Sequence, residues 1–148
     1  MSFFFDLTKQ APRSPRVRLG GYAILPRMLD KGRATLNGKQ GEYHYGCPTD
    51  DLFLQFVGLD ADALKEQLAT GKGDGEILVW IEANARHKRN EAEIHAWSRY
   101  VEGRAPCDLD GREYFHGVHK QVAPQREDIR SWFDLLDMDD YASYGGKV

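Results

Sequence analysis

Side chains able to act as nucleophile, base or anion ligand are concentrated between Leu19 and Cys47. Cys47 follows His44 by three positions, and Tyr43 and Tyr45 flank that histidine. A thiol is a nucleophile when a base or a helix N-terminus activates it. We therefore predict Cys47 and His44 as the catalytic candidates, in thiol or acid–base chemistry. The alternative is that Cys47 is a small buried side chain, as free cysteines often are.

The same stretch predicts a site for an anion. Arg27 and Lys31 are four positions apart, which places them one turn apart on a helix. Guanidinium groups suit phosphate and carboxylate, so both could join the arginines of the N-terminal segment in an anion cradle. The predicted ligand-binding residues are Arg18, Arg27, Lys31, Tyr43, His44 and Tyr45. The alternative is a solvated charged face with local ion pairs, beside tyrosines packed on the core with their hydroxyls bonded.

Metal and cofactor motifs are weak. His116 and His119 are three apart, and His87, Glu91 and His95 follow at spacings of four, yet neither run is a recognised zinc pattern. Residues 71–75 lack the phosphate-loop pattern, and residues 137–140 lack the glycine and glutamate of a calcium loop. We therefore predict neither a metal nor a cofactor.

Composition places the chain among globular proteins. Its 148 residues suit one domain, with 41% hydrophobic and 29% charged residues. No apolar run is long enough to span a membrane, and two cysteines make no disulfide framework, which predicts a cytoplasmic protein. The net charge of −3 and the lack of a binding motif argue against nucleic acid. Residues 1–47 nevertheless carry eight Lys/Arg and three Asp/Glu.

These side chains require helices to position them. Pro12 and Pro15 predict an extended arm over residues 1–18, and a flexible tail is expected over 140–148. Asn37-Gly38 could end the first helix or, alternatively, turn a short hairpin. Between arm and tail, apolar spacing and cap residues predict six or seven short helices, beginning near Leu25, Thr49, Ala61, Asp74, Asn90, Arg112 and Pro124. The fold class is a compact all-α bundle of one domain.

Two phrases carry a family resemblance: SPRVRLGGYAILPRMLDKGRATLNGKQGEYHYGCP near the start and DIRSWFDLLDMDD near the end. They resemble an uncharacterised bacterial family, the domain of unknown function DUF5069, over nearly the whole chain. The resemblance implies a single compact domain and supplies no activity, cofactor or partner.

The leading functional prediction is a small binding module for an anionic small molecule or a protein partner, without nucleic acid or membrane. An enzyme using Cys47 or His44 is the alternative. A scaffold whose acidic residues 127–140 meet a basic partner is a third class. The residues carry no indication of the oligomeric state.

Overall fold

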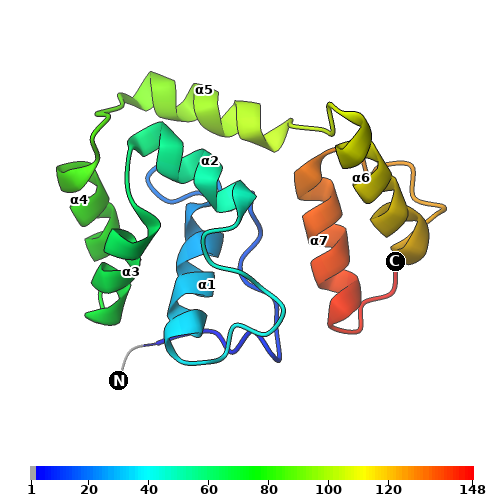
Figure 1. Cartoon of the computed structure of the whole chain (residues 1–148), viewed down its shortest axis with the longest axis horizontal. Helices are drawn as coiled ribbons and strands as arrows, with labels where there is room; N and C mark the ends of the chain where they lie inside the picture. Colours follow the sequence, from blue (N-terminus) through cyan, green and yellow to red (C-terminus); the bar gives the residue numbers. More distant parts are fainter. Residues whose placement is uncertain (1–2) are drawn as a thin grey trace.

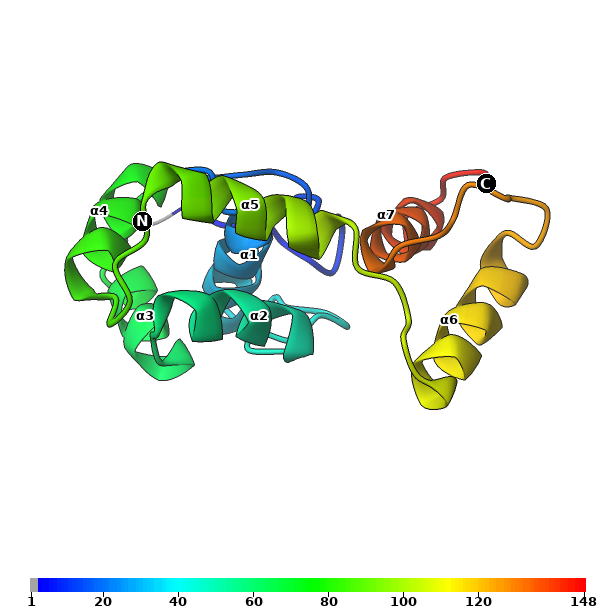
Figure 2. The ribbon, with the colours of Figure 1, turned by 90° about the horizontal axis from the view of Figure 1, so that it is seen from above.

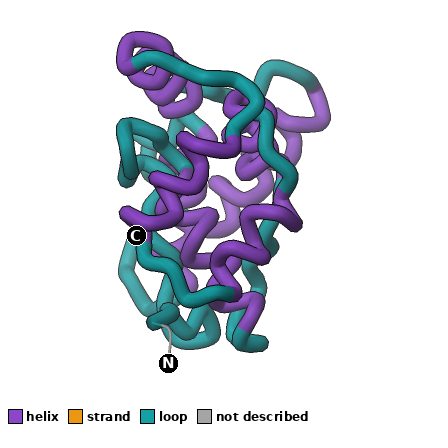
Figure 3. Tube along the Cα trace, turned by 90° about the vertical axis from the view of Figure 1, so that its left-hand side faces the viewer, coloured by secondary structure: helices purple, strands orange, loops and turns teal. Residues whose placement is uncertain are grey.

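The computed structural model describes residues 3–148 and builds them from helices and loops (Figure 1). The seven helices of this part are α1 (Leu25–Leu36), α2 (Pro48–Val57), α3 (Ala61–Ala69), α4 (Asp74–Asn84), α5 (Glu91–Glu102), α6 (Leu109–Val122) and α7 (Trp132–Ser143). Figure 3 shows no strand among them, and an isolated bridge joins Leu19 to Tyr22. The all-α prediction is confirmed. The chain turns at Gly38, with φ of 67°, after α1 has ended, so the alternative hairpin at Asn37-Gly38 is not formed.

Helix α1 forms where its sequence predicts and lies at the centre of the fold. Pro26 fits its first turn because that position needs no N–H donor. The expectation of a solvated charged face is wrong: Arg27, Asp30 and Lys31 are only 4%, 2% and 3% exposed. Periodicity locates the apolar stripe of a helix but does not show that other segments also cover its opposite face. Here the N-terminal segment, α2 and α7 supply partners for these charges.

Four helix starts differ from those predicted. Cys47, not Thr49, is the N-cap of α2, and Gly73, not Asp74, is the N-cap of α4. Helix α6 begins at Leu109 and not at Arg112, because Asp108 caps it by accepting from Gly111 N. The helix start predicted near Asn90 is confirmed, because Asn90 and Glu93 form a capping box in which the Asn90 side chain accepts from Glu93 N at 2.8 Å. The last helix starts at Trp132 and not near Pro124, because Ser131 and Asp134 form a capping box there.

Both ends of the chain are packed more closely than the sequence predicts. Leu7 of the N-terminal segment is 1% exposed, and its N–H donates to Lys39 O at 2.9 Å. Tyr144 donates its hydroxyl to Leu7 O at 2.7 Å. The predicted tail is wrong for residues 140–143, which belong to α7. The N-terminal arm therefore contributes to the core, and the C-terminal helix lies against it.

Two apolar clusters divide the helices. The larger one surrounds α1 and takes side chains from α2, α3, α4 and α5, with Phe133 added by α7. The smaller one lies between α6 and α7 and holds Phe115, Ala123, Ile129, Leu135 and Met138. Figures 1 and 2 show α5 running across the bundle towards α6, with the α6–α7 pair beside the other helices. A seam therefore runs between the α6–α7 pair and the other helices, and polar residues line part of it.

Candidate functional site

A cavity of about 670 Å³ opens along this seam, and we call it the α1–α7 cavity. The N-terminal segment, α1, α6, α7 and the segment that leads into α2 form its wall. The lining residues are Leu7, Thr8, Arg27, Lys31, Gly41, Glu42, Tyr43, His44, Cys47, Thr49, Tyr114, Leu136, Asp139, Asp140, Ser143 and Tyr144. A volume of this size accommodates a small organic molecule.

Arg27, Tyr43 and Asp140 form one polar group in the wall. Arg27 Nη1 donates to Asp140 Oδ2 at 2.7 Å, and the Tyr43 hydroxyl donates to Asp140 Oδ1 at 2.8 Å. The guanidinium carbon lies 5.5 Å from the centroid of the Tyr43 ring. Burial and then the hydrogen bond to Asp140 raise the pKa of Tyr43, so the phenol remains a donor. The charge of Arg27 is thus balanced inside the protein.

Lys31, Cys47 and Asp50 form a second group, beside the first. Lys31 Nζ lies 3.2 Å from Cys47 Sγ and 3.0 Å from Asp50 Oδ2. The side chains of Lys31 and Asp50 are 4% and 0% exposed. Gly46 N also donates to Asp50 Oδ2, at 2.9 Å. The loop that carries His44 and Cys47 is therefore tied to α1 through a buried ion pair.

The cavity brings together five of the predicted site residues: Arg27, Lys31, Tyr43, His44 and Cys47. His44 lies exposed at its rim. The other two are elsewhere. Arg18 donates to Glu102 Oε1 at 2.7 Å, on α5. Tyr45 faces the larger core and donates its hydroxyl to Ala61 O at 2.6 Å.

Sequence reasoning did not find the carboxylates that complete these groups. In the sequence, Asp50 has only the pattern of an acidic residue in the first turn of a helix, and Asp140 lies in the segment expected as a tail. No sequence motif singles out Tyr114 or Tyr144, which also line the cavity. The charge pattern gives a weak indication for Asp140, because acidic residues of the C-terminal third and basic residues of the first third are expected to pair. No local pattern identifies which acid meets which base.

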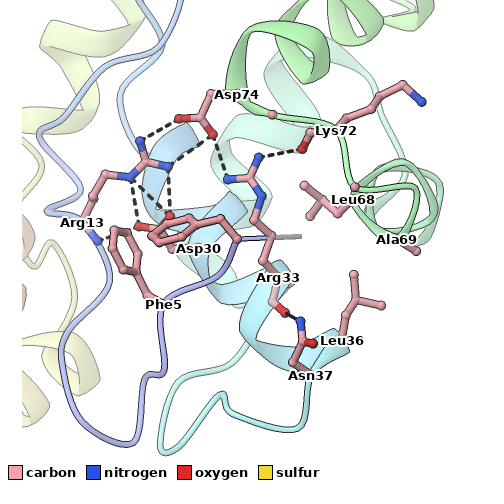
Figure 4. Close-up of a pocket in the computed structure, with 13 residues that line it drawn as sticks. Phe5, Arg13, Asp30, Arg33, Leu36, Asn37, Leu68, Ala69, Lys72 and Asp74 are labelled. Carbon is pink, nitrogen blue, oxygen red and sulfur yellow. Dashed lines mark hydrogen bonds and ion pairs between the residues drawn. The ribbon is translucent and has the colours of Figure 1, made fainter. Parts of the chain in front are cut away.

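The arginines of the N-terminal segment do not enter the α1–α7 cavity as a cradle. Arg16 pairs with Asp134 and Asp137 of α7. Arg13 lies over a different cavity, of about 560 Å³, shown in Figure 4. The proposed joint anion site of arm and helix is therefore not formed, because each of these arginines is held by a carboxylate of the chain itself.

Figure 4 shows how Arg13 joins distant segments through two aspartates. Its guanidinium donates to Asp30 Oδ1 at 2.9 Å and to Asp74 Oδ2 at 2.7 Å. Arg33 donates to the other Asp74 oxygen at 2.8 Å. Burial by itself would raise the pKa of Asp74, but the hydrogen bonds from Arg13 and Arg33 outweigh it and lower the pKa. This network connects the N-terminal segment, α1 and the start of α4.

Acid should loosen this network. Because the folded-state pKa of Asp74 lies below its ordinary value of 3.8, the carboxylate stabilises the fold above that value. The stabilisation is lost as the pH falls through the lower, folded-state pKa. We expect the melting temperature to fall between about pH 5 and about pH 3, and the fall to be smaller in Asp74→Asn. Calorimetry across this range checks it, with the exposed Asp110→Asn as control; an equal fall in both variants contradicts it.

The described residues contain neither a metal-binding cluster nor a membrane-spanning helix. No group of three or more His, Cys, Asp or Glu in residues 3–148 is arranged to hold a metal ion. His119 instead lies 2.6 Å from Arg126 O through Nε2. None of the helices in these residues has the length and apolar character needed to cross a bilayer.

Comparison with known proteins agrees with the resemblance seen in the sequence. A search of curated proteins finds no match. The model of one family, described as "Domain of unknown function (DUF5069)", matches residues 9–142. The match includes α1 to α6, most of α7 and all but four of the residues that line the α1–α7 cavity. The four outside it are Leu7, Thr8, Ser143 and Tyr144. The chain therefore belongs to the DUF5069 family.

Proposed function

We propose that the protein is a binding module for a small anionic molecule, which it holds in the α1–α7 cavity. The observation that carries the proposal is the convergence of Lys31, Arg27, Tyr43 and His44 on one cavity of about 670 Å³. A carboxylate or phosphate needs N–H and O–H donors of this kind. The proposal keeps the cytoplasmic location expected from the sequence; two unpaired cysteines agree with it.

Lys31 is the main cationic contact for such a ligand. An ammonium has three donors. Lys31 Nζ donates to Cys47 Sγ and forms an ion pair with Asp50 Oδ2. In the proposed complex a further donor binds a ligand oxygen. Arg27 is matched by Asp140, so its contribution is to position Tyr43 and to present the edge of its guanidinium.

The remaining walls indicate that the ligand is not a bare inorganic ion. Leu136 supplies apolar surface, and the exposed residues Tyr114 and Tyr144 also line the cavity. Pockets for organic ligands combine apolar walls with a few polar groups. A small carboxylic acid or phosphate ester with a hydrocarbon or ring part fits this combination.

The scaffold alternative is less well supported by the contacts. Asp134, Asp137 and Asp140 belong to the expected acidic face of residues 127–140, and Arg16 and Arg27 pair with these three. A basic partner would have to displace these internal arginines. Binding of a protein partner is the second candidate function, and the exposed side chains of Tyr114 and Tyr141 support it.

Thermal shift with a panel of small carboxylates and phosphate esters tests the proposal. A ligand at a hundredfold excess over its Kd should stabilise the folded state by about 2.7 kcal/mol. Tyr114→Ala should weaken binding about tenfold, because an apolar contact is lost. Tyr100→Ala is the matched control, since Tyr100 and Tyr114 are 64% and 65% exposed on helices. No shift with any acid, or equal loss in both variants, overturns the site.

A further inference from the structure

Cys47 and Cys107 are the free cysteines of the chain, and their surroundings differ. Cys47 is half-buried and lines the α1–α7 cavity. Cys107 is exposed in the segment between α5 and α6. The difference gives an internal reference for thiol reactivity in one molecule.

The sulfur of Cys47 faces an ammonium and not the N–H groups of its own helix. Cys47 is the N-cap of α2, but its side chain makes no capping hydrogen bond. Its contact is to Lys31 Nζ, at 3.2 Å. The sequence suggested activation by the helix N-terminus, whereas the structure supplies a cation from α1.

A buried carboxylate holds that cation in place. Asp50 Oδ2 forms an ion pair with Lys31 Nζ and accepts from Gly46 N, so the ammonium is held beside the sulfur. The other oxygen, Asp50 Oδ1, is buried without a hydrogen-bond partner from the described residues. Buried polar atoms in folded proteins nearly always have a partner, protein or otherwise, so a small polar guest is expected at this group.

We propose that Cys47 is a nucleophilic thiol that forms a covalent bond with a small, carboxylate-bearing electrophile entering the α1–α7 cavity. Reactive cysteines in proteins occur beside lysine and arginine side chains, and the Cys47 sulfur lies 3.2 Å from Lys31 Nζ. Lys31, which lines the cavity with its ammonium 3.2 Å from the sulfur, would hold the carboxylate of the electrophile beside Cys47. The carboxylate class rests on the proposed function; the reactivity of the thiol does not.

The step balances without an oxidant. The thiol releases its proton to solvent, and the sulfur electron pair forms a bond to the electrophilic carbon. The bond from that carbon to its leaving group breaks, and the leaving group departs with the bonding electrons. With iodoacetate as the probe, the product is a carboxymethyl thioether on Cys47 and the leaving group is iodide.

Alkylation of the full-length protein with limiting iodoacetate at neutral pH tests the thiol. Peptide mass spectrometry then gives the rates at Cys47 and Cys107 separately. We expect Cys47 to react about tenfold faster than Cys107 although it is less exposed, and the two rates to become similar in urea. A native Cys47 that reacts no faster than Cys107 overturns the proposal.

Iodoacetamide, which is neutral, separates the two parts of the proposal. A Cys47-to-Cys107 rate ratio that is higher with iodoacetate supports the carboxylate class. Equal ratios, both well above one, uphold the nucleophilic thiol and overturn the carboxylate class. If a ligand identified by thermal shift removes the rate advantage of Cys47 over Cys107, both proposals concern the same cavity.

The double variant Lys31→Met/Asp50→Asn tests the positioning role without leaving one buried charge unpaired. It should lose most of the rate advantage of Cys47, while the rate at Cys107 is unchanged. An advantage that persists in the folded double variant overturns the role of Lys31. If this variant does not fold, the comparison of native and urea-treated wild type still decides whether Cys47 is reactive.

Discussion

Replacing Lys31 with methionine should lower the free energy of unfolding by about 3–5 kcal/mol. The methionine leaves Asp50, whose side chain is 0% exposed, without the ammonium that now lies 3.0 Å away. Among the described residues, Gly46 N would be the remaining donor to that carboxylate. A buried charge without its partner costs far more than the ion pair contributes, since neither water nor another cation can replace it. Urea unfolding followed by circular dichroism measures the change.

Two further variants serve as controls for Lys31→Met. Lys120→Met changes an exposed lysine on α6 and should alter stability by no more than about 0.5 kcal/mol. Lys31→Met/Asp50→Asn should be more stable than Lys31→Met alone, because the unpaired charge is removed together with the cation. A single variant as stable as the wild type would mean that Lys31 and Asp50 are not a buried pair.

The second large effect concerns the seam between α1 and α7. Arg27→Met should lower the free energy of unfolding by about 3 kcal/mol, because it removes the cation from Asp140. The two side chains are 5% and 12% exposed, and Tyr43 would be left as the donor to that carboxylate. Since the cavity wall includes all three residues, anion binding should weaken as well. Unfolding in urea and thermal shift with the best ligand measure the two effects.

Arg16→Met is the matched control for Arg27→Met. Arg16 also pairs with carboxylates of α7, Asp134 and Asp137, but its side chain is 41% exposed. Exposed pairs contribute at most about 1 kcal/mol, because water screens them and replaces them easily. Similar losses from both variants would show that burial of the Arg27–Asp140 pair has no special weight in holding α7.

These predictions share one feature of the molecule: its buried charges join segments that are far apart in sequence. Arg27 and Asp140 are separated by 113 positions, and Arg13 and Asp74 by 61. Polar contacts of this kind are sensitive to geometry, because their benefit depends on distance and on exclusion of water. The α1–α7 cavity lies on the same seam, so ligand binding and the attachment of α7 should be coupled.

Local patterns in the sequence determined the helices. Pro26 marked the first turn of α1, and the Asn90–Glu93 box marked the start of α5. Each depends on bonds within a few residues, which propensity and capping rules describe. Such rules gave the wrong start for α7: Pro124 predicts a helix start, but the capping box that begins α7 is formed by Ser131 and Asp134. Two competing local signals can be ranked only by what each helix packs against.

The tertiary structure alone decided which charged residues are buried and what they meet. The sequence identified Arg27, Lys31 and Cys47 as members of one stretch, and its spacing placed the first two on one helix face. It could not show that Asp50 and Asp140 would neutralise them, or that Arg18 and Tyr45 would face other neighbours. The physical reason is that a helix pattern reports one apolar face, whereas the partner of a buried charge is set by segments that only folding brings into contact.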